Sequence, residues 1–168
     1  VNAHEGLINC VSYHRESNIL VTGGIDGKAC LWRVEFKFSL ISRSTPVKVA
    51  HISDFSLLSE KDEPLTNKHS IQSICINSNE DYRKILLGNR VGEIYEVNVD
   101  VNPENSTITR IFRANDDEII TSVSCDPTSK LLFTLSKAGL FIIWDVNSAL
   151  KILFHKHFHK NAVEVIAF

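Results

Sequence analysis

The stretch Thr22-Gly23-Gly24-Ile25-Asp26-Gly27-Lys28-Ala29-Cys30-Leu31-Trp32 decides the fold. It places a glycine-rich turn between two short runs of apolar and β-branched residues, the first beginning at Ile19 and the second ending at Val34. Two such runs joined by a turn with Asp-Gly predict an antiparallel β-hairpin.

The same unit recurs twice along the chain. The second copy joins Ile85–Leu87 to Glu93–Val97, and the third joins Leu131–Leu135 to Leu140–Trp144. No segment has an apolar stripe of helical spacing with caps at its ends. The sequence therefore predicts an all-β protein built from short strands.

A further strand is predicted ahead of each hairpin. These leading strands are Ile8–Tyr13, Ile71–Asn77 and Ile119–Cys125, and Val163–Phe168 starts a fourth copy. Repeats of about 40 to 50 residues with several strands each are typical of β-propeller blades. We expect blade-like repeats over residues 4–68, 69–114 and 115–158, with the next repeat starting over 159–168.

The first repeat is longer because it contains a polar insertion over residues 38–68. We expect Val47–Ile52 inside this insertion to form the outer strand of the blade, with equivalents at Ile108–Arg113 and Lys151–Phe154. Closed propellers have about four to eight blades. Three repeats and one strand are therefore expected to be a fragment of a larger propeller.

The first repeat resembles a WD40 repeat, with Ala3-His4 near its start, Asp26 in the hairpin turn and Trp32 at its end. The third repeat contains the Trp144-Asp145 dipeptide. The resemblance implies a structural hydrogen-bonded network in each blade, because a buried imidazole and a buried indole N–H both need partners. The matching positions are His4, Thr22, Asp26, Trp32, Thr134, Trp144 and His159.

The other two repeats depart from this pattern. The third has Asp116 at the His position and Ala138 at the Asp position. The second has Leu87, Val91 and Val97 at the Ser/Thr, Asp and Trp positions. We therefore expect these two repeats to be held by apolar packing alone.

The segment Ile85–Val97 also resembles a degenerate blade of the echinoderm microtubule-associated protein-like family. This narrower resemblance implies a cytoskeletal scaffold with tubulin or microtubules as partner. The alternative is a general WD40 adaptor in a signalling or ubiquitin-ligase type complex. Both are non-catalytic protein-binding functions.

Composition argues against several classes of protein, namely nucleic-acid binders, membrane-spanning proteins and secreted proteins. The 168 residues carry a formal net charge of −2, which argues against a general nucleic-acid binder. There is no run of 18 apolar residues that could span a membrane, and no signal peptide is visible. The widely spaced cysteines are expected to be reduced thiols of a cytoplasmic protein; they are Cys10, Cys30, Cys75 and Cys125.

Nothing in the sequence predicts an enzyme, a cofactor or a metal site. The turn at Gly23–Ala29 lacks phosphate-loop spacing, and no G-x-S-x-G elbow is present. Alternating His155, His157 and His159 are the best metal candidates, but a polar outer strand explains them better. The acidic run Asn115–Glu118 lacks the glycine and spacing of a calcium loop.

Surface charge gives the one candidate binding site. Ile25, Arg90 and Lys137 occupy equivalent turn positions in the three repeats. We expect these turns to meet at one rim near the central channel. Arg90 and Lys137 would there hold an acidic protein surface, because Arg and Lys pair with carboxylates.

Overall fold

The fold is seen in a computed structural model. It describes residues 4–37, 45–57, 69–77, 83–113, 118–126, 130–145 and 152–157. Strands make up most of these residues, and η3 (Pro103–Asn105) is a single 3₁₀ turn between two of them. Among the described residues, no helix has the length and apolar character needed to cross a membrane.

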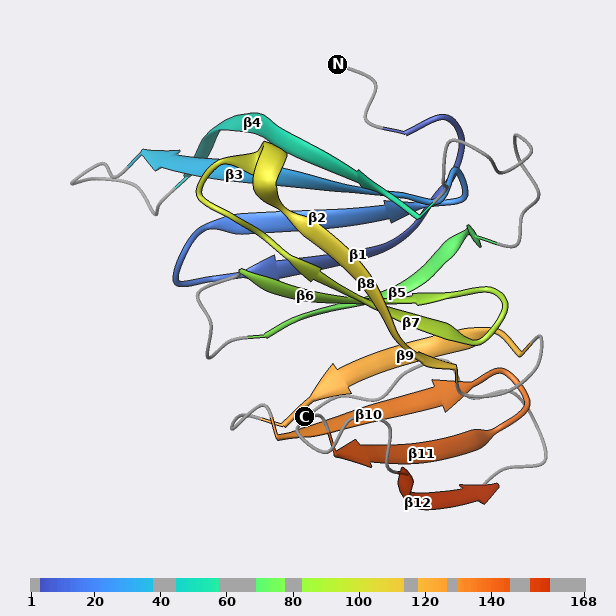
Figure 1. Ribbon diagram of the computed structural model, residues 1–168. Helices are drawn as coiled ribbons and strands as arrows, with labels where there is room; N and C mark the ends of the chain where they lie inside the picture. The colour runs from blue at the N-terminus through green and yellow to red at the C-terminus, as the bar shows by residue number, and fades with distance from the viewer. Residues whose placement is uncertain are drawn as a thin grey trace.

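The strands form three antiparallel four-stranded sheets, which confirms the predicted propeller-type blades. Blade 1 contains β1 (Ile8–His14), β2 (Ile19–Gly24), β3 (Lys28–Lys37) and β4 (Thr45–Ser56). Blade 2 contains β5 (Ile71–Ile76), β6 (Lys84–Asn89), β7 (Glu93–Asn98) and β8 (Thr107–Arg113). Blade 3 contains β9 (Ile120–Cys125), β10 (Leu131–Ser136), β11 (Leu140–Asp145) and β12 (Ile152–His157). Figure 1 shows the blades following one another from blue through green and yellow to red.

The outer strands β4 and β12 extend beyond their predicted limits. β4 is 12 residues long, because its pairing with β3 continues from Lys28 opposite Ser56 to Lys37 opposite Thr45. The predicted leading strand Val163–Phe168 lies outside the described residues. Residues at the junctions between repeats also lie outside them, so the proposed repeat limits stay predictions.

A glycine with positive φ closes each central hairpin. The φ angles are 72° at Gly27, 80° at Gly92 and 82° at Gly139. Side chains with a Cβ adopt this left-handed region only at a cost, whereas glycine enters it readily. The three hairpins therefore share one turn geometry despite their different sequences.

Two apolar cores lie between successive blades. Alternate residues of a strand point to opposite faces, so each blade contributes one face to the blade before it and one to the blade after it. The first core joins blades 1 and 2 and includes Ile19, Val21, Leu31, Ile71, Ile85, Leu87 and Val97. The second joins blades 2 and 3 and includes Leu86, Ile94, Ile120, Leu132, Leu140, Ile142 and Trp144. Burial of each such side chain contributes about 1.5–3 kcal/mol.

Gly23 and Gly88 let the blades approach closely. A Cβ on Gly23 would lie 2.6 Å from Ile71 Cγ2, and one on Gly88 would lie 2.6 Å from Ile120 Cγ2. Both contacts are with the first residue of the inner strand of the next blade. The equivalent position of blade 3 is occupied by Leu135.

Candidate functional site

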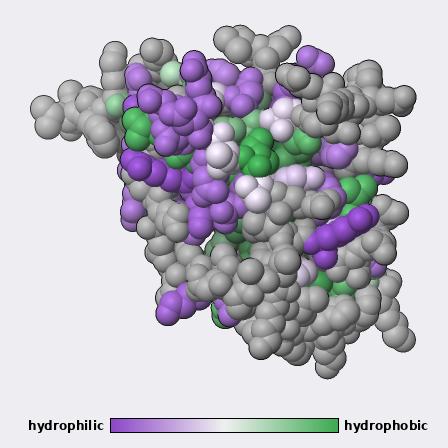
Figure 2. Space-filling model, in the orientation of Figure 1, coloured by the Kyte–Doolittle hydropathy of each residue, from purple (hydrophilic) through white to green (hydrophobic). Residues whose placement is uncertain are grey.

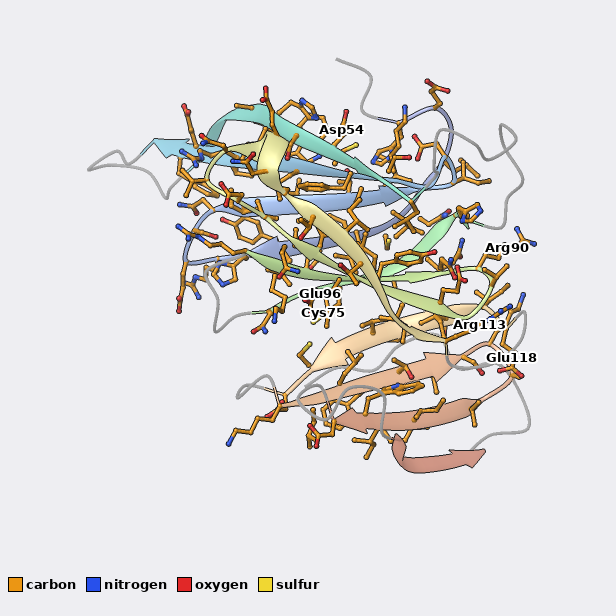
Figure 3. All side chains as sticks on the ribbon, viewed as in Figure 1. Asp54, Cys75, Arg90, Glu96, Arg113 and Glu118 are labelled. Carbon is orange, nitrogen blue, oxygen red and sulfur yellow. The ribbon has the colours of Figure 1, made fainter. Side chains whose placement is uncertain are left out.

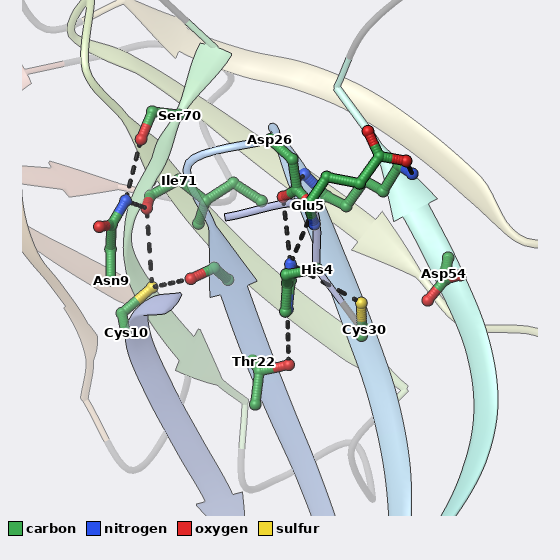
Figure 4. A network of polar contacts seen from close by, with 12 residues as sticks. His4, Glu5, Asn9, Cys10, Thr22, Asp26, Cys30, Asp54, Ser70 and Ile71 are labelled. Carbon is green, nitrogen blue, oxygen red and sulfur yellow. Dashed lines mark hydrogen bonds and ion pairs between the residues drawn. The ribbon is translucent and has the colours of Figure 1, made fainter. Parts of the chain in front are cut away.

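His4 lies just before the first strand of blade 1 and is hydrogen-bonded to the central hairpin of that blade. Its Nε2 lies 2.9 Å from Thr22 Oγ1, and its Nδ1 lies 3.1 Å from Asp26 Oδ1 (Figure 4). Trp32 Nε1 donates to the same Thr22 oxygen over 3.1 Å. The side chains of His4 and Asp26 are only 1% and 2% exposed. The four side chains therefore form one hydrogen-bonded chain whose polar groups satisfy each other.

Asp26 also accepts two backbone hydrogen bonds. Glu5 N–H donates to it over 2.9 Å and Lys28 N–H over 3.1 Å. Burial opposes the charged form of this carboxylate. The hydrogen bonds from Glu5, His4 and Lys28 outweigh that penalty and hold the pKa of Asp26 below its ordinary value.

In all three hairpins, a side chain accepts a hydrogen bond from the backbone N–H of the residue after the turn glycine. In blade 1, Asp26 accepts from Lys28 N–H. In blade 2 the equivalent Glu93 N–H donates to Asn89 Oδ1 over 2.8 Å. In blade 3 the equivalent Leu140 N–H donates to Ser136 Oγ over 3.2 Å. The capping side chain moves from the turn itself to the last residue of the preceding strand.

The expectation that blade 2 is held by apolar packing alone is wrong. Leu87 and Val97 are fully buried, as their apolar character requires. A second polar network accompanies them, however. Asn89 Nδ2 donates to Glu93 Oε2 over 3.0 Å, and Tyr95 O–H donates to the same oxygen over 2.8 Å.

Apolar packing alone does not describe blade 3 either. Trp144 Nε1 donates to Thr134 Oγ1 over 2.9 Å, and both side chains are buried. This indole–hydroxyl bond occurs in a blade that has Asp116 at the family's His position and Ala138 at its Asp position. The signal missed in the sequence was a polar residue ending the second strand of each blade, Asn89 in blade 2 and Ser136 in blade 3.

The three hairpin turns are fixed to the inner strands in the same way. The N–H of each turn residue donates to the carbonyl oxygen of the residue just before the inner strand of its own blade. The pairs are Ile25 to Leu7 at 2.9 Å, Arg90 to Ser70 at 3.1 Å and Lys137 to Ile119 at 2.9 Å. The Arg90 and Lys137 side chains are exposed at this end of the blades.

Two buried polar atoms lie next to the anchoring carbonyls. His69 precedes Ser70 and Glu118 precedes Ile119, and both hold equivalent places in successive blades. Within the described part of the chain, His69 Nδ1 and Glu118 Oε2 are buried without a hydrogen-bond partner. Figure 3 shows Arg90 and Glu118 at the same end of the molecule, with Arg113. We call Arg90, Lys137, His69 and Glu118 the rim.

Several predicted residues cannot be placed. His159 and Asp116 lie outside the described residues, as do the side chains of His155 and His157. Across the described ranges, no group of three or more His, Cys, Asp or Glu side chains could hold a metal ion.

Comparison with known families connects this geometry to a class of proteins. Residues 48–165 match the Pep3/Vps18/deep orange β-propeller domain family, and residues 1–33 match the WD domain, G-β repeat. The chain belongs to the Pep3/Vps18/deep orange β-propeller domain family. The WD domain match covers the segment that contains the His4 network. A propeller domain of this kind points to a protein-interaction scaffold.

Two curated relatives bear the name Restriction of telomere capping protein 1. The chain is 29% identical to the Kluyveromyces lactis protein over 101 residues, which is 59% of this chain and 7% of the relative. It is 38% identical to the Lachancea thermotolerans protein over 56 residues, which is 33% of this chain and 4% of the relative. The chain thus spans a small part of both relatives. The narrower resemblance to the echinoderm microtubule-associated protein-like family stays a prediction.

Proposed function

We propose that this chain is a non-catalytic protein-interaction scaffold whose rim binds an acidic, extended segment of a partner protein. The anchoring of the three turns carries the proposal. It keeps Arg90 and Lys137 at equivalent places on neighbouring blades, where one ligand can contact both.

The charge of the rim supports an acidic ligand. In the described parts of the chain, neither Arg90 nor Lys137 forms a salt bridge, whereas Lys28 and Lys84 pair with Glu5 and Glu96 at 3.6 Å. A guanidinium binds a carboxylate through two parallel hydrogen bonds, and an ammonium adds a mobile point charge. Exposed ion pairs contribute only about 0–1 kcal/mol each, so Arg90 and Lys137 contribute more to the specificity for an acidic ligand than to the affinity.

The two buried rim atoms without partners, His69 Nδ1 and Glu118 Oε2, favour a ligand with an extended backbone that supplies hydrogen-bonding groups. A buried polar atom without a partner costs about 1–3 kcal/mol. A backbone N–H of the bound segment would donate to Glu118 Oε2, and a polar group of it would pair with His69 Nδ1, once both side chains turn outward from their buried positions. Figure 2 shows that the described residues of one face are mostly hydrophilic, with hydrophobic ones in small groups among them.

Two classes of partner fit this proposal: microtubules, and the protein partners of a general adaptor. Microtubule association follows from the resemblance of Ile85–Val97 and from the acidic character of tubulin. A general adaptor function needs no microtubule contact. The name of the curated relatives refers to telomere capping and adds no support for microtubule association. Cytoplasmic localisation also stays a prediction.

Charge reversal tests the proposal. The variant with Arg90→Glu and Lys137→Glu should lose partners that the unchanged chain captures, and the remaining binding should not weaken as salt rises. The matched control is Arg33→Glu with Lys130→Glu, which changes the same charges on exposed residues away from the turns. Equal capture by all three proteins would contradict a binding role for the rim.

Pelleting with polymerised tubulin across a salt series separates the two partner classes. Salt-sensitive co-pelleting that the rim variant loses and the control keeps would support the microtubule function. Capture of other proteins without pelleting would support the general adaptor function.

A further inference from the structure

Cys75 and Cys125 face each other across the interface of blades 2 and 3. Cys75 lies on β5, the inner strand of blade 2, opposite Leu86 of β6. Cys125 ends β9, the inner strand of blade 3, opposite Leu132 of β10. Both side chains pack against the same apolar core. Figure 3 shows Cys75 at the boundary between these blades.

The two thiols are in direct contact. A side-chain hydrogen bond joins them, and Cys75 Sγ also lies 3.8 Å from the carbonyl oxygen of Ile76. Both residues are free cysteines of intermediate burial. They come from strands of different blades, and the fold alone brings them together.

The shared hydrogen bond gives the two sulfurs different roles. The hydrogen bond from Cys125 lowers the pKa of Cys75 against the opposing effect of burial. The same hydrogen bond, together with burial, raises the pKa of Cys125 well above its ordinary value. Cys75 is thus the thiol of the pair that ionises more readily, and it would act as the nucleophile while Cys125 keeps its proton.

We propose that Cys75 and Cys125 form a thiol-oxidation site at which hydrogen peroxide joins blades 2 and 3 by a reversible disulfide. The Cys75 thiolate attacks one peroxide oxygen, the O–O bond breaks, and the leaving hydroxide takes a proton to become water. Cys75 is then a sulfenic acid.

The second step closes the bond between the blades. Cys125 sulfur attacks the sulfur of the sulfenic acid, the S–OH bond breaks, and the hydroxyl leaves as water with the Cys125 proton. In total, two thiols and one hydrogen peroxide give one disulfide and two waters, and two electrons pass from sulfur to oxygen. A dithiol reductant reverses the reaction by thiol–disulfide exchange.

Cys10 and Cys30 supply internal controls. Burial raises the pKa of each thiol to about 12, although a backbone hydrogen bond with Gly23 partly offsets this for Cys10. Cys10 Sγ lies 3.9 Å from the Gly23 carbonyl oxygen, and Cys30 Sγ lies 4.0 Å from His4 Nδ1. Both are therefore expected to react slowly with peroxide.

The test treats the full chain with one equivalent of hydrogen peroxide, blocks remaining thiols with N-ethylmaleimide and maps peptides without reduction. The expected product is a single cross-link between Cys75 and Cys125, removed by dithiothreitol. Because the disulfide constrains the unfolded chain, the oxidised protein should melt on the order of 5–10 °C higher.

Variants assign the roles. Cys125→Ser should stop at a sulfenic acid on Cys75 that dimedone traps, and Cys75→Ser should slow peroxide consumption at least tenfold. Cys10→Ser and Cys30→Ser should leave the cross-link unchanged. Loss of all four thiols at similar rates, or no cross-linked peptide from the unchanged chain, would overturn the proposal whether or not the variants fold.

Discussion

Blade 1 and blade 2 close their central hairpins with the same backbone and with different polar groups. Blade 1 uses the turn carboxylate of Asp26, which reaches His4 and two backbone N–H groups. Blade 2 has Val91 at that position and caps the equivalent N–H with Asn89. The difference shows that the blade requires a capped turn rather than the particular residues of the WD40 pattern.

The two networks also differ in what they connect. The blade 1 network ties the segment before β1 to β2 and β3 through His4, Thr22 and Trp32. The blade 2 network stays within one hairpin, joining Asn89 to Glu93 and Tyr95. Removing the centre of each network should therefore cost blade 1 more than blade 2.

The largest effect is expected for Asp26→Ala. It leaves the Glu5 and Lys28 N–H groups and the His4 ring without their acceptor in a buried place, so the free energy of unfolding should fall by about 2–4 kcal/mol. Val91→Ala, at the equivalent position of blade 2, should change it by less than about 0.5 kcal/mol. Urea denaturation measures both, and similar losses for the two variants would remove the distinction between the blades.

A smaller effect is expected for Glu93→Ala. It leaves the Asn89 amide and the Tyr95 hydroxyl without their shared acceptor, so unfolding should become easier by about 1–3 kcal/mol. Lys28→Ala, the equivalent change in blade 1, removes a partly exposed ion pair with Glu5 and a longer-range attraction to Asp54, and should cost less than about 1 kcal/mol. If Glu93→Ala has no measurable effect in the same denaturation assay, apolar packing alone explains the stability of blade 2 after all.

The fold could be predicted from the sequence because it depends on features that are local in the chain. Alternating apolar residues on both sides of a Gly-containing turn specify a hairpin wherever they occur, and the three copies showed the repeat. The outer strands were placed less well. The extent of β4 depends on its pairing with the long β3, and the apolar pattern of β4 itself does not show where that pairing ends.

The supporting networks were predictable only where the family pattern is intact. His4, Thr22, Asp26 and Trp32 could be singled out because they match that pattern. The network of Asn89, Glu93 and Tyr95 could not, because its acceptor and donors are ordinary strand residues until the turn brings them together. The contact of Cys75 with Cys125 is less local still, since it needs the packing of two blades.

The smallest expected difference is between the two turn caps, Asp26 and Asn89, in their response to acid. The folded-state pKa of Asp26 lies below its ordinary value of 3.8, so its ionised form stabilises the protein above that pH. This contribution is lost as the pH falls through the folded-state value, because the protonated carboxyl no longer accepts all its hydrogen bonds. Asn89 caps the equivalent turn with an amide, which has no proton to gain in this range.

Denaturation curves between pH 6 and pH 3 should therefore separate Asp26→Asn from the unchanged chain. The variant starts less stable at pH 6, and its stability should fall less steeply below about pH 5. Asp54→Asn is the control: the Asp54 carboxylate also has a lowered pKa, but its side chain is 48% exposed, so water screens its interactions and the slope should change less. An unchanged slope in Asp26→Asn would mean that Asp26 contributes a fixed hydrogen-bond geometry and that its charge has no part in the stability of blade 1.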